Sequence, residues 1–261
     1  MTWLTKIRTR ILVFVAVLAL PVALAAEVHC PSVSTPSPGS TVNGGLDVDG
    51  TCIVDTVTVN GGITIESGGH LQLMSSTVNG GIVTLPCGEI DVNALTANGT
   101  PTGTTSTING GIDIAAGAVC TTLGAMSNAD IWTAQINGGI SITGTYSAGD
   151  IPFICHNQIK GNVDVHNATV PLGFVIGDPD EGFGSSCIGN TISGALIMGN
   201  SSLFKVESNA IGGSVLLSAS MLELNGNAIG GSLKCSDGTV IVPDPGDPPN
   251  TVHGETHGCP P

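Results

Sequence analysis

The chain has 261 residues and a formal net charge of −14, from 20 acidic residues against six Lys and Arg. Nucleic-acid binding and attachment to anionic membrane surfaces both require clustered cationic side chains, so this composition excludes them. A hydrophobic fraction of 41%, placed periodically, also argues against a disordered chain.

Residues 1–26 have the pattern of a secretory signal peptide. Three basic residues precede an apolar run from Ile11 to Leu20, and the small residues around Ala25 suit cleavage. The run is shorter than the roughly 20 residues that a membrane span needs. We therefore predict a secreted or cell-surface protein with no membrane partner after cleavage. Its mature part keeps all 20 acidic residues and three Lys, a formal charge of −17.

A short frame recurs ten times after this segment: Val or Ile, then Gly two residues later, then apolar residues at the fifth and seventh places. The frames begin at Val42, Val59, Val78, Ile108, Ile136, Ile159, Ile192, Ile211, Ile229 and Val252. The fifth place departs from the pattern at Thr256, and the seventh at Thr84 and Gly258. Strand side chains alternate between two faces, so the four frame places share one face, whereas a helix would space its apolar residues differently.

Recurrence of a frame predicts a solenoid. Four of the intervals are 17 to 19 residues, which suits three short strands per coil, and the longer intervals add surface loops. We predict an all-β fold, a parallel β-helix (β-solenoid) of about ten coils. Its frame glycines would point inward at a bend where a side chain would collide with the opposite wall. A β-sandwich also fits several short strands but gives no reason for the recurrence.

The chain divides into a signal peptide (1–26), an N-terminal cap (27–41), the solenoid (42–258) and a C-terminal tail (259–261). Asn placement separates two sub-blocks of the solenoid, about 42–150 and 151–258. In the first, Asn directly follows the opening residue of each frame, and in the second it precedes that residue by two. Asn side chains stacked at one corner of successive coils can bond one another, so we predict two structural Asn ladders.

All eight cysteines follow the signal peptide, and an even number in an exported chain predicts disulfides rather than free thiols. In chain order the neighbouring pairs are Cys30 and Cys52, Cys87 and Cys120, Cys155 and Cys187, and Cys235 and Cys259. Each pair is separated by about one coil. Neighbour pairing is therefore preferred among the 105 possible connectivities, and it would staple adjacent coils.

The C-terminal third resembles a known group of proteins. The stretch Asn227-Ala-Ile-Gly-Gly-Ser-Leu-Lys-Cys235, a Pro- and Asp-rich segment, Asn250-Thr-Val-His-Gly254 and the closing Cys259 carry the likeness. They are similar to small secreted actinobacterial proteins with tandem Asn-x-Val-x-Gly-Asn-Leu units. The resemblance covers about residues 157–261 and implies a secreted repeat fold without an assigned activity. The frame alone is similar to that of bactofilins, polymer-forming β-helix proteins that are cytoplasmic and cysteine-poor.

An enzymatic role has little support in the sequence, and no catalytic residue is predicted. Lyases of the parallel β-helix fold typically use an Arg or Lys base, but no Lys here lies beside an acidic cluster. Sugar subsites usually need aromatic platforms, and the mature chain has six aromatic residues: Trp132, Tyr146, Phe153, Phe174, Phe183 and Phe204. Five of the six fall between positions 132 and 183. A carbohydrate-active enzyme or glycan-binding protein would therefore use the 132–187 face.

The same region holds the candidate metal ligands Asp178, Asp180 and Glu181. Three carboxylates in four residues can coordinate calcium, which prefers oxygen ligands. A solvated acidic turn is the alternative, favoured by Pro179 and Gly182. No other cofactor is predicted.

We therefore expect a secreted, non-enzymatic structural, adhesive or assembly protein, with copies of itself or a cell-surface glycan as partners. A carbohydrate-active enzyme or glycan binder is the alternative. An ice-binding solenoid ranks third, because ice binding needs a flat Thr column in register. The sequence shows only the pair Thr56 and Thr58 and isolated Thr residues.

Overall fold

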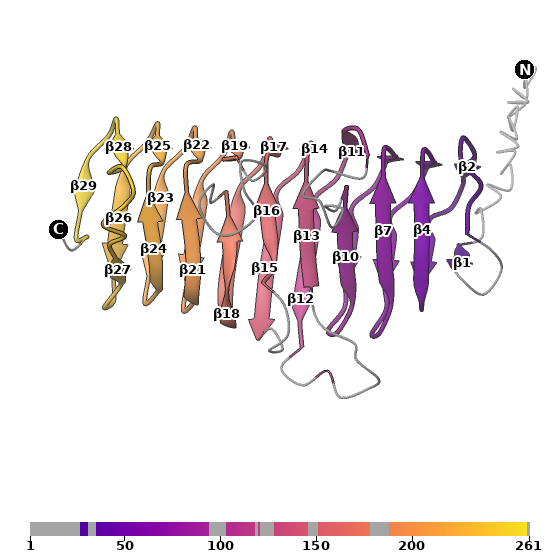
Figure 1. Ribbon diagram of the computed structural model, residues 1–261, viewed down its shortest axis with the longest axis horizontal. Coiled ribbons are helices and arrows are strands. Elements are labelled where there is room, and N and C mark those ends of the chain that lie inside the picture. Colours follow the sequence, from indigo (N-terminus) through magenta and orange to yellow (C-terminus); the bar gives the residue numbers. More distant parts are fainter. Residues whose placement is uncertain are drawn as a thin grey trace, which may run out of the picture.

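The computed structural model describes residues 27–30, 35–93, 103–117, 120, 128–145, 151–177 and 188–259. Within these ranges every regular element is a β-strand, and the strands stack side by side along one axis into a rod (Figure 1). All of the described strand pairs that build the rod are parallel, so the predicted parallel β-solenoid is confirmed. The predicted signal peptide, residues 1–26, lies outside the described residues.

Each coil adds one strand to each of three faces, which we call face 1, face 2 and face 3 in chain order. Face 1 consists of β2 (Thr41–Val42), β5 (Thr58–Val59), β8 (Thr77–Val78), β11 (Ser106–Ile108), β14 (Ala134–Ile136), β17 (Gln158–Ile159), β19 (Thr191–Ile192), β22 (Ala210–Ile211), β25 (Ala228–Ile229) and β28 (Thr251–Val252). Its strands are two or three residues long, and they form a hydrogen-bonded sheet of their own.

Faces 2 and 3 are joined by one long strand, β18 (Val163–Ile176), which pairs with β15 at its start and with β16 at its end. Face 2 contains β1 (Val28–Cys30), β3 (Leu46–Val48), β6 (Ile63–Ile65), β9 (Ile82–Thr84), β12 (Ile112–Ala116), β15 (Ile140–Thr145), the start of β18, β20 (Leu196–Gly199), β23 (Val215–Ser218), β26 (Leu233–Ser236) and β29 (Thr256–His257). Face 3 contains β4 (Thr51–Asp55), β7 (His70–Met74), β10 (Glu89–Val92), β13 (Asn128–Trp132), β16 (Phe153–Cys155), the end of β18, β21 (Ser202–Glu207), β24 (Met221–Asn225) and β27 (Val240–Val242).

The strand register places equivalent frame residues in columns that run along the rod. Val59, which opens a frame, pairs with Val42 on one side and Val78 on the other. The fifth frame place behaves in the same way on face 2, where Ile63 lies between Leu46 and Ile82. These columns line the interior and form one apolar core that extends along the rod. The apolar residues of each frame therefore form the core-facing surface of a coil.

The prediction for the frame glycines was wrong in its physical reason. They lie at the corner between faces 1 and 2, and they face the preceding coil rather than the opposite wall. A Cβ on Gly138 would lie 2.6 Å from the backbone nitrogen of Gly111 and 2.7 Å from the carbonyl carbon of Gly110. At this corner the Gly138 N–H also donates to the Gly110 carbonyl, at 3.0 Å. Close stacking of successive backbones is what excludes a side chain here.

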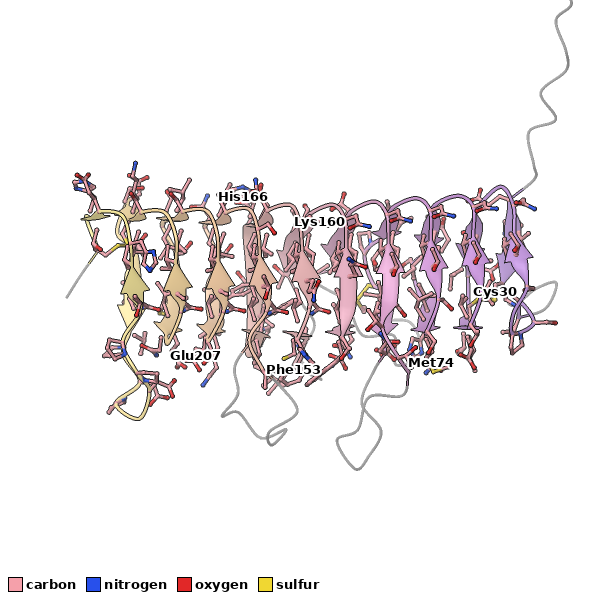
Figure 2. All side chains as sticks on the ribbon, turned by 90° about the horizontal axis from the view of Figure 1, so that it is seen from above. Cys30, Met74, Phe153, Lys160, His166 and Glu207 are labelled. Atoms are coloured by element: carbon pink, nitrogen blue, oxygen red, sulfur yellow. A yellow bond between two sulfur atoms is a disulfide. The ribbon has the colours of Figure 1, made fainter. Side chains whose placement is uncertain are left out.

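The first predicted Asn ladder lies outside the core, at the same corner. The Nδ2 group of each Asn donates to Oδ1 of the Asn in the preceding coil, at 2.6 to 2.8 Å. The column consists of Asn43, Asn60, Asn79, Asn109 and Asn137. Lys160 takes the next place, and it lies on the same long edge of the rod as His166 (Figure 2).

The second ladder is buried at the corner between faces 3 and 1. Its members are Asn157, Asn190, Asn209, Asn227 and the partly buried Asn250. For each of the first four, both the backbone N–H and Nδ2 donate to Oδ1 of the Asn in the following coil, at 2.9 to 3.0 Å. Nδ2 also donates to a backbone carbonyl of the preceding coil, such as that of Ile131. Burial of these amides is therefore compensated by hydrogen bonds.

Three disulfides join cysteines that are neighbours in chain order, as preferred from the sequence. They are Cys30–Cys52, Cys87–Cys120 and Cys235–Cys259, with Cα–Cα distances of 5.6, 5.4 and 4.8 Å. Cys155 is also disulfide-bonded, and its predicted partner Cys187 lies outside the described residues. The bonds near the two ends of the described rod hold the first and last coils against their neighbours.

Replacing Gly138 by Ala tests the stacking constraint. The added methyl group would overlap the backbone of the preceding coil, so we expect a loss of about 1–3 kcal/mol in unfolding free energy. Gly246→Ala is the matched control, because a Cβ there would approach Asp244 Oδ1 at an ordinary 3.5 Å. Denaturant unfolding measures both variants. Equal stability of the two would contradict the constraint.

Candidate functional site

The calcium ligands predicted from the sequence, Asp178, Asp180 and Glu181, lie outside the described residues, as do Tyr146 and Phe183. The calcium site therefore stays a prediction. The other four aromatic residues are described, and three of them, Trp132, Phe153 and Phe174, test whether the 132–187 face offers platforms for sugars.

All four described aromatic rings are buried. Trp132 and Phe153 point outward from face 3, but they pack on each other, with ring centroids 6.0 Å apart, in a small apolar cluster that includes Val175. Phe153 lies on the long edge of the rod opposite Lys160 (Figure 2). Phe174 and Phe204 instead stack inside the core at 5.2 Å. None of these rings presents a face to a sugar, so they support packing rather than glycan binding.

An exposed apolar surface lies on the C-terminal coils, beside face 3. We call it the C-terminal apolar groove, and it holds a cavity of about 190 Å³. Five large apolar side chains that line or adjoin it are exposed: Leu172 (55%), Leu203 (41%), Met221 (40%), Val240 (49%) and Val242 (39%). Contiguous exposed apolar side chains can mark an interaction site, so the groove is a candidate for one.

Strand register and one strained residue build the groove. Met221 pairs with Ser202 and Val240, so the exposed side chains of successive coils lie next to one another. Leu203 sits at a register shift between Ser202 and Phe204 and has a φ of 63°, a left-handed conformation that costs a Leu of the order of 1–3 kcal/mol. The shift turns Leu203 out into the groove. The Lys205–Glu223 ion pair, at 2.9 Å, borders the groove.

A second candidate site is a cluster of His70, Glu89 and Asp91 on face 3. Glu89 pairs with His70 in register, and Asp91 lies two residues further along β10, on the same outward side. His70 Nε2 is 2.8 Å from Asp91 Oδ2, and Nδ1 is 3.8 Å from Glu89 Oε2. All three side chains are partly buried. The imidazole therefore lies between two carboxylates from the next coil.

This arrangement changes the pKa of the histidine. The hydrogen bond that His70 donates to the Asp91 carboxylate raises the pKa of His70 above its ordinary value, and partial burial opposes that shift. The negative charges of Asp91, Glu89 and Asp130 add to the rise. Asp130 lies in the next coil, where it pairs with Asp91. The cluster thus favours a positive charge at its centre.

Face 1 carries a regular polar array that the sequence analysis did not recognise. Thr41, Thr58, Thr77 and Thr107 occupy successive outward places in register. The exposed Asn ladder runs beside them, at the second residue after each Thr and just beyond the end of each strand. The array ends where Gln135 and Gln158 replace Thr. The statement that Thr residues are isolated was therefore wrong, because coils of unequal length bring Thr77 and Thr107 together.

Chain spacing could have revealed the His70 cluster. His70 and Glu89 are 19 residues apart, the same interval that separates the frames at Val59 and Val78. Residues separated by one frame interval become neighbours across a coil boundary. The groove had no comparable signal, because it depends on the irregular strands β18 and β21.

No protein-family model matches the chain, and comparisons with curated proteins and with solved structures found no significant match. No helix in the described part of the chain is long and apolar enough to cross a membrane. Because the comparisons found no match, the candidate sites are interpreted from their own geometry.

Titration of His70 tests the electrostatics of the cluster. Because its pKa is raised in the folded state, the charged histidine should contribute stability below its ordinary pKa of about 6.5, and this contribution should be lost as pH rises through the folded-state pKa. We expect Asp91→Asn to lower the pKa of His70, and by more than Glu89→Gln does. NMR titration of the imidazole measures both shifts. A His70 pKa unchanged in Asp91→Asn would contradict this account.

Proposed function

We propose that this chain is an extracellular, non-enzymatic structural protein whose coils associate with a second copy through the C-terminal apolar groove. Several disulfides suit an oxidising, extracellular environment. The predicted signal peptide and the resemblance to secreted repeat proteins favour the same location. The regular coils supply a rigid rod, which is what a structural or assembly role requires.

The single observation that carries the proposal is the cluster of exposed apolar side chains on the last coils. Burying such a surface against an identical one removes it from water and stabilises a dimer. The edge of the rod beside the groove also favours association with a second copy. Within the described residues, β27 pairs on one side with β24, and its two exposed valines lie beside an open edge. Exposed apolar edge strands favour pairing with another chain.

Charge sets a condition on this association. The mature chain has a formal charge of −17, so two copies repel each other at long range. Salt screens that repulsion over a Debye length of about 8–10 Å near physiological ionic strength, whereas apolar burial is not weakened by screening. Self-association through the groove should therefore strengthen as salt concentration rises. Association based on ion pairs would weaken instead.

We expect Leu203→Asp to weaken self-association by roughly tenfold or more, because a carboxylate would be desolvated at the centre of the contact. Ile53→Asp is the matched control: Ile53 is 41% exposed, as Leu203 is, but lies on the N-terminal coils of face 3. Analytical ultracentrifugation over a range of protein and salt concentrations measures both. A wild-type protein that stays monomeric throughout, or an equal effect of both substitutions, would refute the proposal.

The array on face 1 supports ice binding as a second candidate function. Thr residues in successive coils are about 4.8 Å apart, and the Asn that follows each Thr by two residues lies just beyond the end of its face 1 strand, at the corner. Rows of small polar groups at a regular spacing on an exposed surface can hold water molecules in an ordered layer. Four coils carry this Thr-x-Asn pattern, from Thr41 to Asn109.

A bulky side chain in the middle of the array tests this function. We expect Thr77→Tyr to abolish measurable thermal hysteresis, because the ring would hold ice away from the neighbouring coils. Thr64→Tyr serves as the control, since Thr64 is an outward residue on face 2. Nanolitre osmometry compares both variants with the wild type. Thermal hysteresis absent from the wild type, or unchanged in Thr77→Tyr, would exclude ice binding through face 1.

A further inference from the structure

We propose that His70, Glu89 and Asp91 form a binding site for one divalent transition-metal ion, with Zn²⁺ as the best match. This site is separate from the groove, because it lies on the N-terminal coils of face 3, whereas the groove is formed by β18, β21, β24 and β27. It is therefore independent of the proposed self-association.

The distances allow a shared ion without rebuilding the backbone. One ligand atom from each of the three side chains can be chosen so that all three lie within 4.8 Å of one another. Tetrahedral zinc, bound at about 2.0–2.2 Å, keeps its ligand atoms about 3.3–3.6 Å apart. Side-chain rotations that shorten the longest separation by about 1 Å would therefore bring the three atoms to one ion.

The parallel ladder holds the ligands in place. β7 carries His70 and β10 carries Glu89 and Asp91, and four consecutive residue pairs join these two strands. Ligands on paired strands are better positioned than ligands on loops. The side chains are 24%, 30% and 14% exposed, so an ion can enter, yet its attraction to the carboxylates is less screened than at an open surface.

The donor set and the local charge select the ion. An imidazole nitrogen favours zinc and other late transition metals, whereas calcium and magnesium prefer oxygen ligands alone. Asp130 on the adjacent strand adds a third carboxylate to the surroundings of His70. All three Lys of the mature chain lie at position 160 or beyond, so none is close in sequence to the cluster. A dication would neutralise this concentration of negative charge.

Three other His–carboxylate pairs show why this location differs. They are His29–Asp47, His166–Asp164 and His257–Glu255, at 2.9, 2.6 and 2.8 Å. Among the described residues, each of these has a single carboxylate close to its histidine, whereas His70 has two within 3.8 Å. These three pairs are internal controls. If one carboxylate beside a histidine were enough to bind the metal, all four locations would bind it equally.

An ion held between β7 and β10 would link two successive coils, as the disulfides do elsewhere in the rod. Because the ligands converge in the folded chain and not in the unfolded chain, binding would stabilise the fold by mass action. The site thus predicts zinc-dependent stability of the N-terminal coils.

Isothermal titration of the full, tag-free protein with ZnCl₂ at neutral pH tests the site. We expect one equivalent to bind, and Glu89→Gln to weaken it by about tenfold or more, since loss of even an outer-shell partner costs 10–100-fold. Asp164→Asn, which alters a single-carboxylate pair, should bind as the wild type does. Wild-type affinity in Glu89→Gln, or an equal loss in Asp164→Asn, would overturn the proposal.

Thermal unfolding gives a second readout. Added Zn²⁺ should raise the melting temperature of the wild type and raise that of Glu89→Gln by less at the same Zn²⁺ concentration, while circular dichroism without metal should be the same for both. The Zn²⁺-induced shift should also be lost in His70→Ala. A Zn²⁺-induced shift of wild-type size in His70→Ala would show that the imidazole is not a ligand, and the assignment would fail.

Discussion

The structure depends on one constraint, the close parallel stacking of each coil on the one before it. Backbone hydrogen bonds join the coils on all three faces and continue through the corner between faces 1 and 2. At that corner the backbones approach so closely that a Cβ on Gly61, Gly80 or Gly138 would lie 2.5 to 2.6 Å from backbone atoms of the preceding coil. Residues without a side chain are therefore required at one place in each coil, whatever the rest of the coil contains.

Stacking also explains how a narrow rod can bury polar groups. A corner leaves backbone groups that a flat sheet would pair, and the buried Asn column supplies partners for them. Asn190, for example, donates to the carbonyl of Ile154 at 2.7 Å and to Asn209 in the next coil. Because each amide bonds to the next, the ladder connects coils through side chains as well as through the backbone.

Because the strands of successive coils pair in register, residues that are far apart in the sequence form surface sites together. A residue on one coil becomes the neighbour of a residue one frame later, so single side chains become rows. The Thr column of face 1, the His70 cluster and the groove around Met221 are three results of this rule. They occupy different parts of the rod, and each combines residues from successive coils. An acidic rod with few aromatic side chains can thus carry several unlike surfaces.

The sequence predicted more of the fold than of the candidate sites. The frame predicted parallel coils with three strands, the two Asn ladders and the neighbour pairing of cysteines, because these depend on intervals along the chain. The Thr array and the His70 cluster could have been found by aligning the coils. The burial of Trp132 and Phe153 could not, since it depends on how face 3 packs on its outer side.

By itself, the sequence determined which residues face the core, because alternation along a strand and the recurring frame need no knowledge of the neighbouring coils. Only the tertiary structure decided which neighbouring atoms exclude a side chain at the frame glycines. They face the preceding backbone and not the opposite wall, since the distance between stacked coils is shorter than the distance across the rod. It also decided that Leu203 is turned outward, because β21 has one residue more than β24 between the paired positions Ser202 and Phe204. Core placement is thus a local property, whereas the candidate binding surfaces are properties of register.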